Sequence, residues 1–323
     1  MSESISTLNR SDDQRRQILG ILGLGLVLYA YGISKTCALG IVPTSLIGWL
    51  FKYWSRGGEY AHGYVVPIIA AGLFMWRWRS GILSIPFRVS NTGLFVVVGA
   101  VALYWIGVKA ANPRVVGGSL VVLVFGGIFY LAGWEWAKKL WFPCAFLLFM
   151  IPLNFLEQYI SFPLRMFVAT LSTWMLNLVG LGVYQIGTGI YSHTGRFSPL
   201  DVADPCSGIR SLVALMALTS LYGYVAMDQG WKKWILFLSS IPLAVLGNLV
   251  RIATVALVAQ GFGSDWAMKI YHDYSGYIVF SLAILCMIAL GIILNLRYEE
   301  IVHRWMREDV RPVRRNTIND RRQ

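Results

Sequence analysis

The chain has 323 residues, of which 56% are hydrophobic and 14% are charged. A soluble globular domain is usually less apolar than this, and several runs approach the roughly 20 apolar residues needed to cross a bilayer. The composition therefore argues against a soluble protein and predicts a polytopic membrane protein. Its formal net charge of +12 does not indicate nucleic-acid binding, because eight arginines lie after residue 296 and are typical of a cytoplasmic tail.

Eight apolar spans predict an all-α membrane protein. We expect one transmembrane domain over residues 18–296, preceded by a cytoplasmic segment at 1–17 and followed by a basic cytoplasmic tail at 297–323. Eight spans that start inside return the chain inside, where the arginine-rich tail is expected. The predicted spans cover residues 18–34, 61–77, 93–111, 115–133, 139–153, 207–226, 234–258 and 275–296.

Residues 155–181 are expected to form an amphipathic helix that lies in the membrane interface, because apolar and polar side chains alternate there with helical spacing. A ninth span at 163–181 would place the tail outside. The expected apolar side consists of Phe162, Phe167, Leu171, Trp174 and Leu178, and the polar residues are Arg165, Ser172, Thr173 and Asn177.

Residues 183–203 differ from their surroundings because β-prone pieces alternate with glycines. Val183 to Ile186 and Gly189 to Tyr191 predict a short β-hairpin. We expect it on the outer surface, where it delivers the chain into Cys206.

Cys206 stands at the junction between this polar segment and an apolar helix, directly after Pro205. Proline suits a helix start, and the unpaired N–H groups of a first helical turn favour thiolate over thiol. Arg210 follows one turn later on the same face. Since a charge inside an apolar span is costly, Arg210 also indicates a functional site.

The predicted topology brings two more polar positions to the same outer level as Cys206. Arg251 lies in the outer half of the seventh span, with Asn248 three residues earlier on the same face, and His272 precedes the eighth span. Thiolate, guanidinium and imidazole are the groups that acyl transfer needs.

Each of these residues also has a purely structural interpretation. A lone cysteine usually packs, Arg251 can snorkel to the interface, and a histidine at a span end is often only interfacial. His62 and His193 compete with His272 as outer-side histidines, and position alone does not choose among them.

Four cysteines (Cys37, Cys144, Cys206 and Cys286) are too few and too scattered for a disulfide framework or a zinc site. Cys144 and Cys286 are expected to be buried small hydrophobes. A disulfide between Cys37 and Cys206 is the alternative to a reactive Cys206. No metal or nucleotide signature is visible, so we expect no cofactor.

Several stretches, taken together and in this order, resemble the exosortase/archaeosortase family over roughly residues 40–296. They are Glu59 to Pro67 with His62, the proline-bounded span from Phe142-Pro143 to Ile151-Pro152, Pro205-Cys206-Ser207-Gly208-Ile209-Arg210-Ser211, Asn248-xx-Arg251 and His272-xxx-Gly276.

The resemblance implies a cysteine transpeptidase or endopeptidase embedded in the cytoplasmic membrane, with its site on the outer side. Cys206 would be the nucleophile, with Arg251 and His272 as partners. The substrates would be exported proteins that end in a PEP-CTERM-type sorting signal, namely a short motif, a transmembrane helix and a basic cluster. The acceptor would be a surface molecule, and a bacterial host with an exported polysaccharide is the expected setting. Membrane lipids are expected partners, and nucleic acid is not.

The resemblance also implies supporting or substrate-contacting roles for Arg210, Ser207, Gly208 and His62. Asp204 stands two residues before Cys206, whereas family members often carry a glutamate shortly before the cysteine. Asp204 is therefore a candidate for positioning His272 or a substrate donor.

Two other classes of function stay open at this stage. A transporter or lipid-handling protein would bind an anionic group through Arg210 and Arg251, and would be expected to show repeat symmetry, which we do not find. A structural subunit of an envelope assembly would have no need for cysteine, arginine and histidine at one level.

Overall fold

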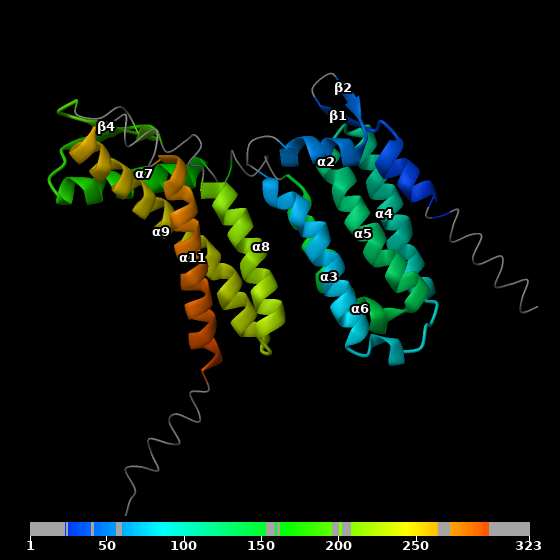
Figure 1. Cartoon of the computed structure of the whole chain (residues 1–323). Helices are drawn as coiled ribbons and strands as arrows, with labels where there is room; N and C mark the ends of the chain where they lie inside the picture. Colours follow the sequence, from blue (N-terminus) through cyan, green and yellow to red (C-terminus); the bar gives the residue numbers. More distant parts are fainter. Residues whose placement is uncertain are drawn as a thin grey trace, which may run out of the picture.

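The computed structural model describes residues 23, 25–39, 42–55, 60–152, 159, 162–195, 200–201, 208–263 and 272–296, except for the side chains at 39, 83, 200–201, 208–211 and 272–275. Over these residues the chain is mostly helical, with two small sheets (Figure 1). The first half contains η1 (Leu28–Ile33), β1 (Cys37–Leu39), β2 (Val42–Thr44), α2 (Leu46–Ser55), η2 (Ala61–Tyr64), α3 (Val65–Arg79), η3 (Ile82–Ser84), α4 (Asn91–Lys109), α5 (Pro113–Ala132), α6 (Trp134–Phe146) and η4 (Leu147–Met150). The second half contains α7 (Phe162–Leu178), β3 (Val183–Ile186), β4 (Gly189–Ser192), β5 (Leu200–Asp201), α8 (Gly208–Ala226), α9 (Gly230–Phe262) and α11 (His272–Asn295).

Four of the described helices are long and apolar enough to cross a membrane. They are α4, α5, α9 and the part of α11 from Gly276 to Asn295. The chain is therefore a multi-pass membrane protein. Among the other predicted spans, α3 has only 15 residues and α6 only 13, so an eight-span topology stays a prediction.

Local sequence explains where α5 begins. The Asn112 side chain accepts a hydrogen bond from the Arg114 amide at 3.1 Å, and Pro113 occupies the first turn. An asparagine cap followed by proline is a favourable helix start, because it satisfies one free N–H and removes another. The antiparallel neighbour α4 lies close to α5 because Gly107 has no side chain to separate it from the backbone of Val116.

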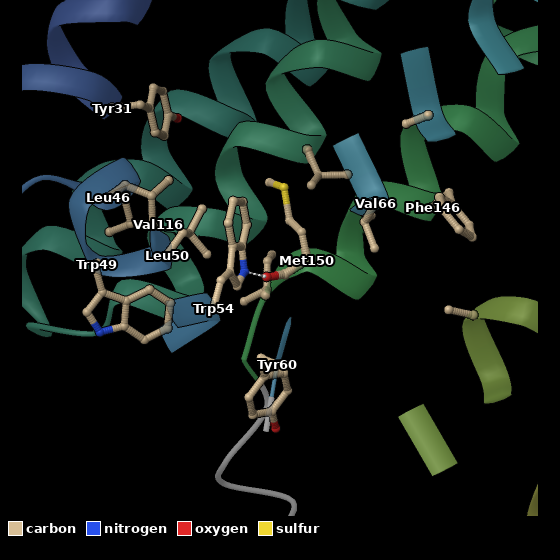
Figure 2. Close-up of a cluster of buried hydrophobic side chains, with 14 of the residues drawn as sticks. Tyr31, Leu46, Trp49, Leu50, Trp54, Tyr60, Val66, Val116, Phe146 and Met150 are labelled. Carbon is tan, nitrogen blue, oxygen red and sulfur yellow. Dashed lines mark hydrogen bonds between the residues drawn. The ribbon is translucent and has the colours of Figure 1, made fainter. Parts of the chain in front are cut away.

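The core of the first half forms around α2, with Leu46, Trp49, Leu50 and Trp54 buried (Figure 2). The indole Nε1 of Trp54 donates a hydrogen bond to the Met150 carbonyl at 2.9 Å, which ties α2 to the end of η4.

The predicted amphipathic helix appears as α7, which lies across the upper ends of α9 and α11 instead of alongside them (Figure 1). Phe167, Trp174 and Leu178 are exposed, each by more than half. The opposite side of α7 packs against α9. Ser172, one of the polar residues of the predicted amphipathic helix, is only 1% exposed and belongs to that buried face. The location of α7 in a membrane interface stays a prediction.

Strands β3 and β4 pair antiparallel, with Val183 opposite Ser192, and β5 adds to β4. Asn177 at the end of α7 holds the first strand, because its amide group both donates to the Val183 carbonyl and accepts from the Val183 N–H, at 2.9 and 2.8 Å. The location of this sheet on the outer surface stays a prediction.

Candidate active site

Three helices of the second half, α8, α9 and α11, share a buried core that contains Leu212, Leu215, Ala244 and Ala283. The start of α8, the end of α9 and the start of α11 lie at the same end of the molecule (Figure 1). This is the arrangement that the predicted topology requires for Cys206, Arg251 and His272.

Arg251 is partly buried on α9 and lies against α11 at Gly276. A Cβ atom added at Gly276 would be 3.7 Å from the Arg251 Cζ and Nη1 and 3.8 Å from Nη2. One turn earlier on α9, a Cβ atom at Gly247 would approach Val279 Cγ1 to 2.9 Å. Gly247 thus lets α9 and α11 approach closely, and one turn away the Arg251 guanidinium lies against α11 at Gly276.

His272 begins α11 and precedes Gly276 by four residues, so both positions share one face of the helix. At about 1.5 Å per residue they are separated by about 6 Å along the helix axis. The His272 position therefore lies one turn from the part of α11 that contacts Arg251. The orientation of the imidazole is outside the description.

The other candidates around the thiol are described only in part. Cys206, Asp204 and Ser207 lie outside the described residues. Gly208 is the first residue of α8, and Arg210 lies in the first turn, with its side chain not described. A helix therefore begins two residues after Cys206, close to the start that Pro205 predicts.

Asn248 lies on α9 one turn before Arg251 and is 8% exposed. Its neighbours Leu249 and Ile252 belong to the core that α9 forms with α7 and the sheet. Asn248 is thus a buried polar residue on the helix that carries the guanidinium, and spacing places it on the face of Arg251.

His62 lies in η2, in the first half. Its ring centre is 5.8 Å from that of Tyr60, and the main chain of Phe149 hydrogen-bonds it. Its Nε2 atom is buried and has no hydrogen-bond partner among the described residues. These contacts do not bring His62 to Arg251. The competing His193 lies after β4, exposed, with its ring 4.7 Å from Tyr184.

Gly63, beside His62, is needed for packing. The Trp54 indole occupies the space that a Cβ atom would fill. The His62-Gly63 pair therefore combines a buried imidazole with a position where only glycine fits without a shift of the tryptophan.

Cys37 is a free thiol, only 3% exposed, so the structure contradicts the alternative of a disulfide between Cys37 and Cys206. Burial raises the pKa of the Cys37 thiol, although the Thr36 side chain partly opposes this. Cys37 therefore remains protonated and poorly nucleophilic. Cys144 is buried and Cys286 partly buried, as free thiols. No group of three or more metal-ligating side chains occurs in the described part of the chain.

Sequence reasoning did not assign a role to Gly247 or Gly276, although both lie where α9 and α11 meet beside Arg251. The available signal was the presence of small residues inside apolar helices, which often mark close helix contacts in membranes. This signal does not by itself identify the residue on the facing helix.

Comparison with known proteins identifies the family to which the chain belongs. No curated protein and no solved structure gives a match. The sequence pattern of the transmembrane exosortase family matches residues 54–289, which include η2, η4, the start of α8, Arg251 and the start of α11. Because this match covers well over half of the 323 residues, the chain belongs to the transmembrane exosortase family.

Proposed function

We propose that this protein is a membrane cysteine transpeptidase or endopeptidase that processes the C-terminal sorting signals of exported proteins. Cys206 is its nucleophile, and Arg251 and His272 are its partners. The site faces the outer side of the cytoplasmic membrane, and the product is passed to a surface acceptor or to water.

In the proposed reaction, the Cys206 thiolate, whose proton has passed to His272, attacks the carbonyl carbon of the peptide bond next to the sorting motif. The tetrahedral intermediate carries a negative oxygen, which the Arg251 guanidinium stabilises. The C–N bond then breaks, the leaving amine takes a proton from His272, and the exported protein remains as a thioester on Cys206. A nucleophilic group of the acceptor, or water, gives its proton to His272, attacks the thioester and releases the thiolate.

The contact of Arg251 with α11 at Gly276, one turn from His272, is the observation that best supports this proposal. A charged side chain between two transmembrane helices costs free energy. Such a cation, one turn from a histidine position, is therefore expected at a functional site. The family match spans both residues and Cys206. Arg210, Asn248, Asp204, Ser207, Gly208 and His62 are proposed to position these groups or the substrate.

The decisive test is Cys206→Ala in cells that produce an exported reporter with a C-terminal sorting signal. We expect full-length reporter to accumulate, while Cys286→Ala, which removes a partly buried thiol from α11, processes it normally. Unchanged processing by Cys206→Ala would exclude the cysteine mechanism. The mass of the new C-terminus then separates transfer to an acceptor from hydrolysis.

The same variants separate an enzyme from a transporter or lipid-handling protein. If Arg210 and Arg251 only bind an anionic group, their substitution impairs function while Cys206→Ala does not. If acyl transfer is the function, Cys206→Ala abolishes processing as completely as Arg251→Ala. We expect the second result.

A further inference from the structure

Two basic residues meet at an aromatic cluster where the two halves of the molecule join, at the end opposite the candidate active site (Figure 1). Arg77 lies in the last turn of α3, Tyr224 in the last turn of α8 and Lys233 in the first turn of α9. The ring of Tyr224 stacks on Phe142 of α6, with centres 4.0 Å apart and an angle of 9° between the planes.

Both cations approach the same tyrosine ring. Arg77 Nε donates a hydrogen bond to the Tyr224 hydroxyl at 2.7 Å, and its Cζ lies 5.0 Å from the ring centre. Lys233 Nζ lies 5.8 Å from that centre. Trp76 completes the cluster, because Arg77 Cζ lies 4.9 Å from its ring. Cation–π contacts of this kind attract the cations to the ring but neutralise neither charge.

The cluster has several hydrogen-bond donors left over. Within the described part of the chain, no carboxylate forms an ion pair with Arg77 or Lys233. In the same residues, no hydrogen-bond acceptor contacts the Nη groups of Arg77 or the Nζ of Lys233. The Tyr224 hydroxyl accepts from Arg77 and still has its own proton to donate. Because Arg77 and Lys233 are only partly exposed, an anion that accepts from both would relieve the penalty of half-buried, unpaired charge.

The position of the cluster indicates where such an anion would come from. Trp76 is 43% exposed at the end of an apolar helix, and tryptophan at this level is typical of a membrane–water interface. Basic pockets between transmembrane helices at this depth bind phosphate headgroups of anionic lipids.

We propose that Trp76, Arg77, Tyr224 and Lys233 form a binding site for the phosphate headgroup of an anionic phospholipid, in the leaflet opposite the candidate active site. The phosphate accepts hydrogen bonds from Arg77, Tyr224 and Lys233, and its acyl chains lie along the exposed side of Trp76. The lipid thereby connects α3 of the first half with α8 and α9 of the second. This site does not depend on the proposed enzyme chemistry.

The test is native mass spectrometry of the full chain in detergent, titrated separately with dioleoylphosphatidylglycerol, dioleoylphosphatidylcholine and inorganic phosphate. We expect phosphatidylglycerol to bind at least ten-fold tighter than phosphatidylcholine, and the double variant Arg77→Gln/Lys233→Gln to abolish this preference. The matched control is Arg79→Gln/Lys138→Gln, which removes the same charge from exposed positions near the same end and should change affinity less than two-fold.

If the double variant does not fold, the single variant Lys233→Gln is used for the same binding measurement, because it leaves the Arg77–Tyr224 hydrogen bond in place. It should weaken phosphatidylglycerol binding at least three-fold. Equal binding of the two lipids, or equal losses in the test and control variants, would overturn the site. If inorganic phosphate binds as tightly as phosphatidylglycerol, the ligand of this site is free phosphate, and the proposal of a lipid ligand is refuted.

Discussion

Residue 276 provides a graded test of how Arg251 is held. An added Cβ atom would lie 3.7 Å from the Arg251 Cζ and Nη1, which is ordinary van der Waals contact. Gly276→Ala should therefore keep most of the processing activity. In Gly276→Val, two methyl carbons extend about 1.5 Å beyond Cβ, and they fill two of the three staggered directions.

A methyl carbon of that valine directed at the guanidinium would come within about 2.2 Å of Cζ, whereas atoms in contact are about 3.5 Å apart. The arginine must then move by more than 1 Å. A displacement of about 1 Å at a catalytic group lowers the rate by about 10²-fold. We expect that loss for Gly276→Val, measured as the rate at which full-length reporter disappears in membranes with matched enzyme amounts.

The control is Gly99→Val on α4, because Gly99 is exposed inside a transmembrane helix and nothing lies within 4 Å of an added Cβ atom there. It carries the same change in helix propensity and should process the reporter at the normal rate. The reasoning fails if Gly276→Val is as active as the native protein while Arg251→Ala is inactive. It also fails if Gly276→Ala is as damaging as Gly276→Val.

Three further outcomes follow from the described contacts. Gly63→Ala forces the Trp54 indole to shift, so the free energy of unfolding should fall by ~2–4 kcal/mol in a denaturation assay. The control Gly72→Ala has open space around the added Cβ atom and should be nearly neutral in the same assay. Because burial raises the pKa of Cys37, iodoacetamide at pH 8 should modify this thiol only after unfolding, as peptide mapping would reveal; rapid labelling of the folded chain would contradict its burial. Cysteines introduced into 183–195 should react with an impermeant reagent added outside the cell, and labelling only after lysis would reverse the predicted topology.

The long apolar helices α4, α5, α9 and α11 were predictable from hydropathy alone, but helix ends depend on packing. The sequence predicts a span from residue 61, whereas α3 begins at Val65. Residues 61–64 instead form a 3-10 turn in which Gly63 accommodates Trp54. This contact joins α2 to the turn before α3, and periodicity within one segment does not reveal it.

The burial of Ser172 could not be predicted, for a related reason. Helix α7 has two apolar sides, and the larger residues, such as Phe167 and Trp174, lie on the exposed one. The side packed against α9 has the smaller Val168 and Ala169, next to Ser172. A pattern weighted by the size of apolar residues therefore does not reveal the face packed against α9, since close packing of helices favours small side chains.

The candidate site was predictable to the extent that it depends on the order of the last helices. Alternating directions place the start of α8, the end of α9 and the start of α11 at one end, and this follows from counting spans. The Tyr224 cluster at the opposite end was not predictable, because it joins Arg77 and Phe142 of the first half to α8 across about 80 to 150 residues of sequence. Helix α8 thus starts beside the proposed nucleophile and ends where the halves are joined.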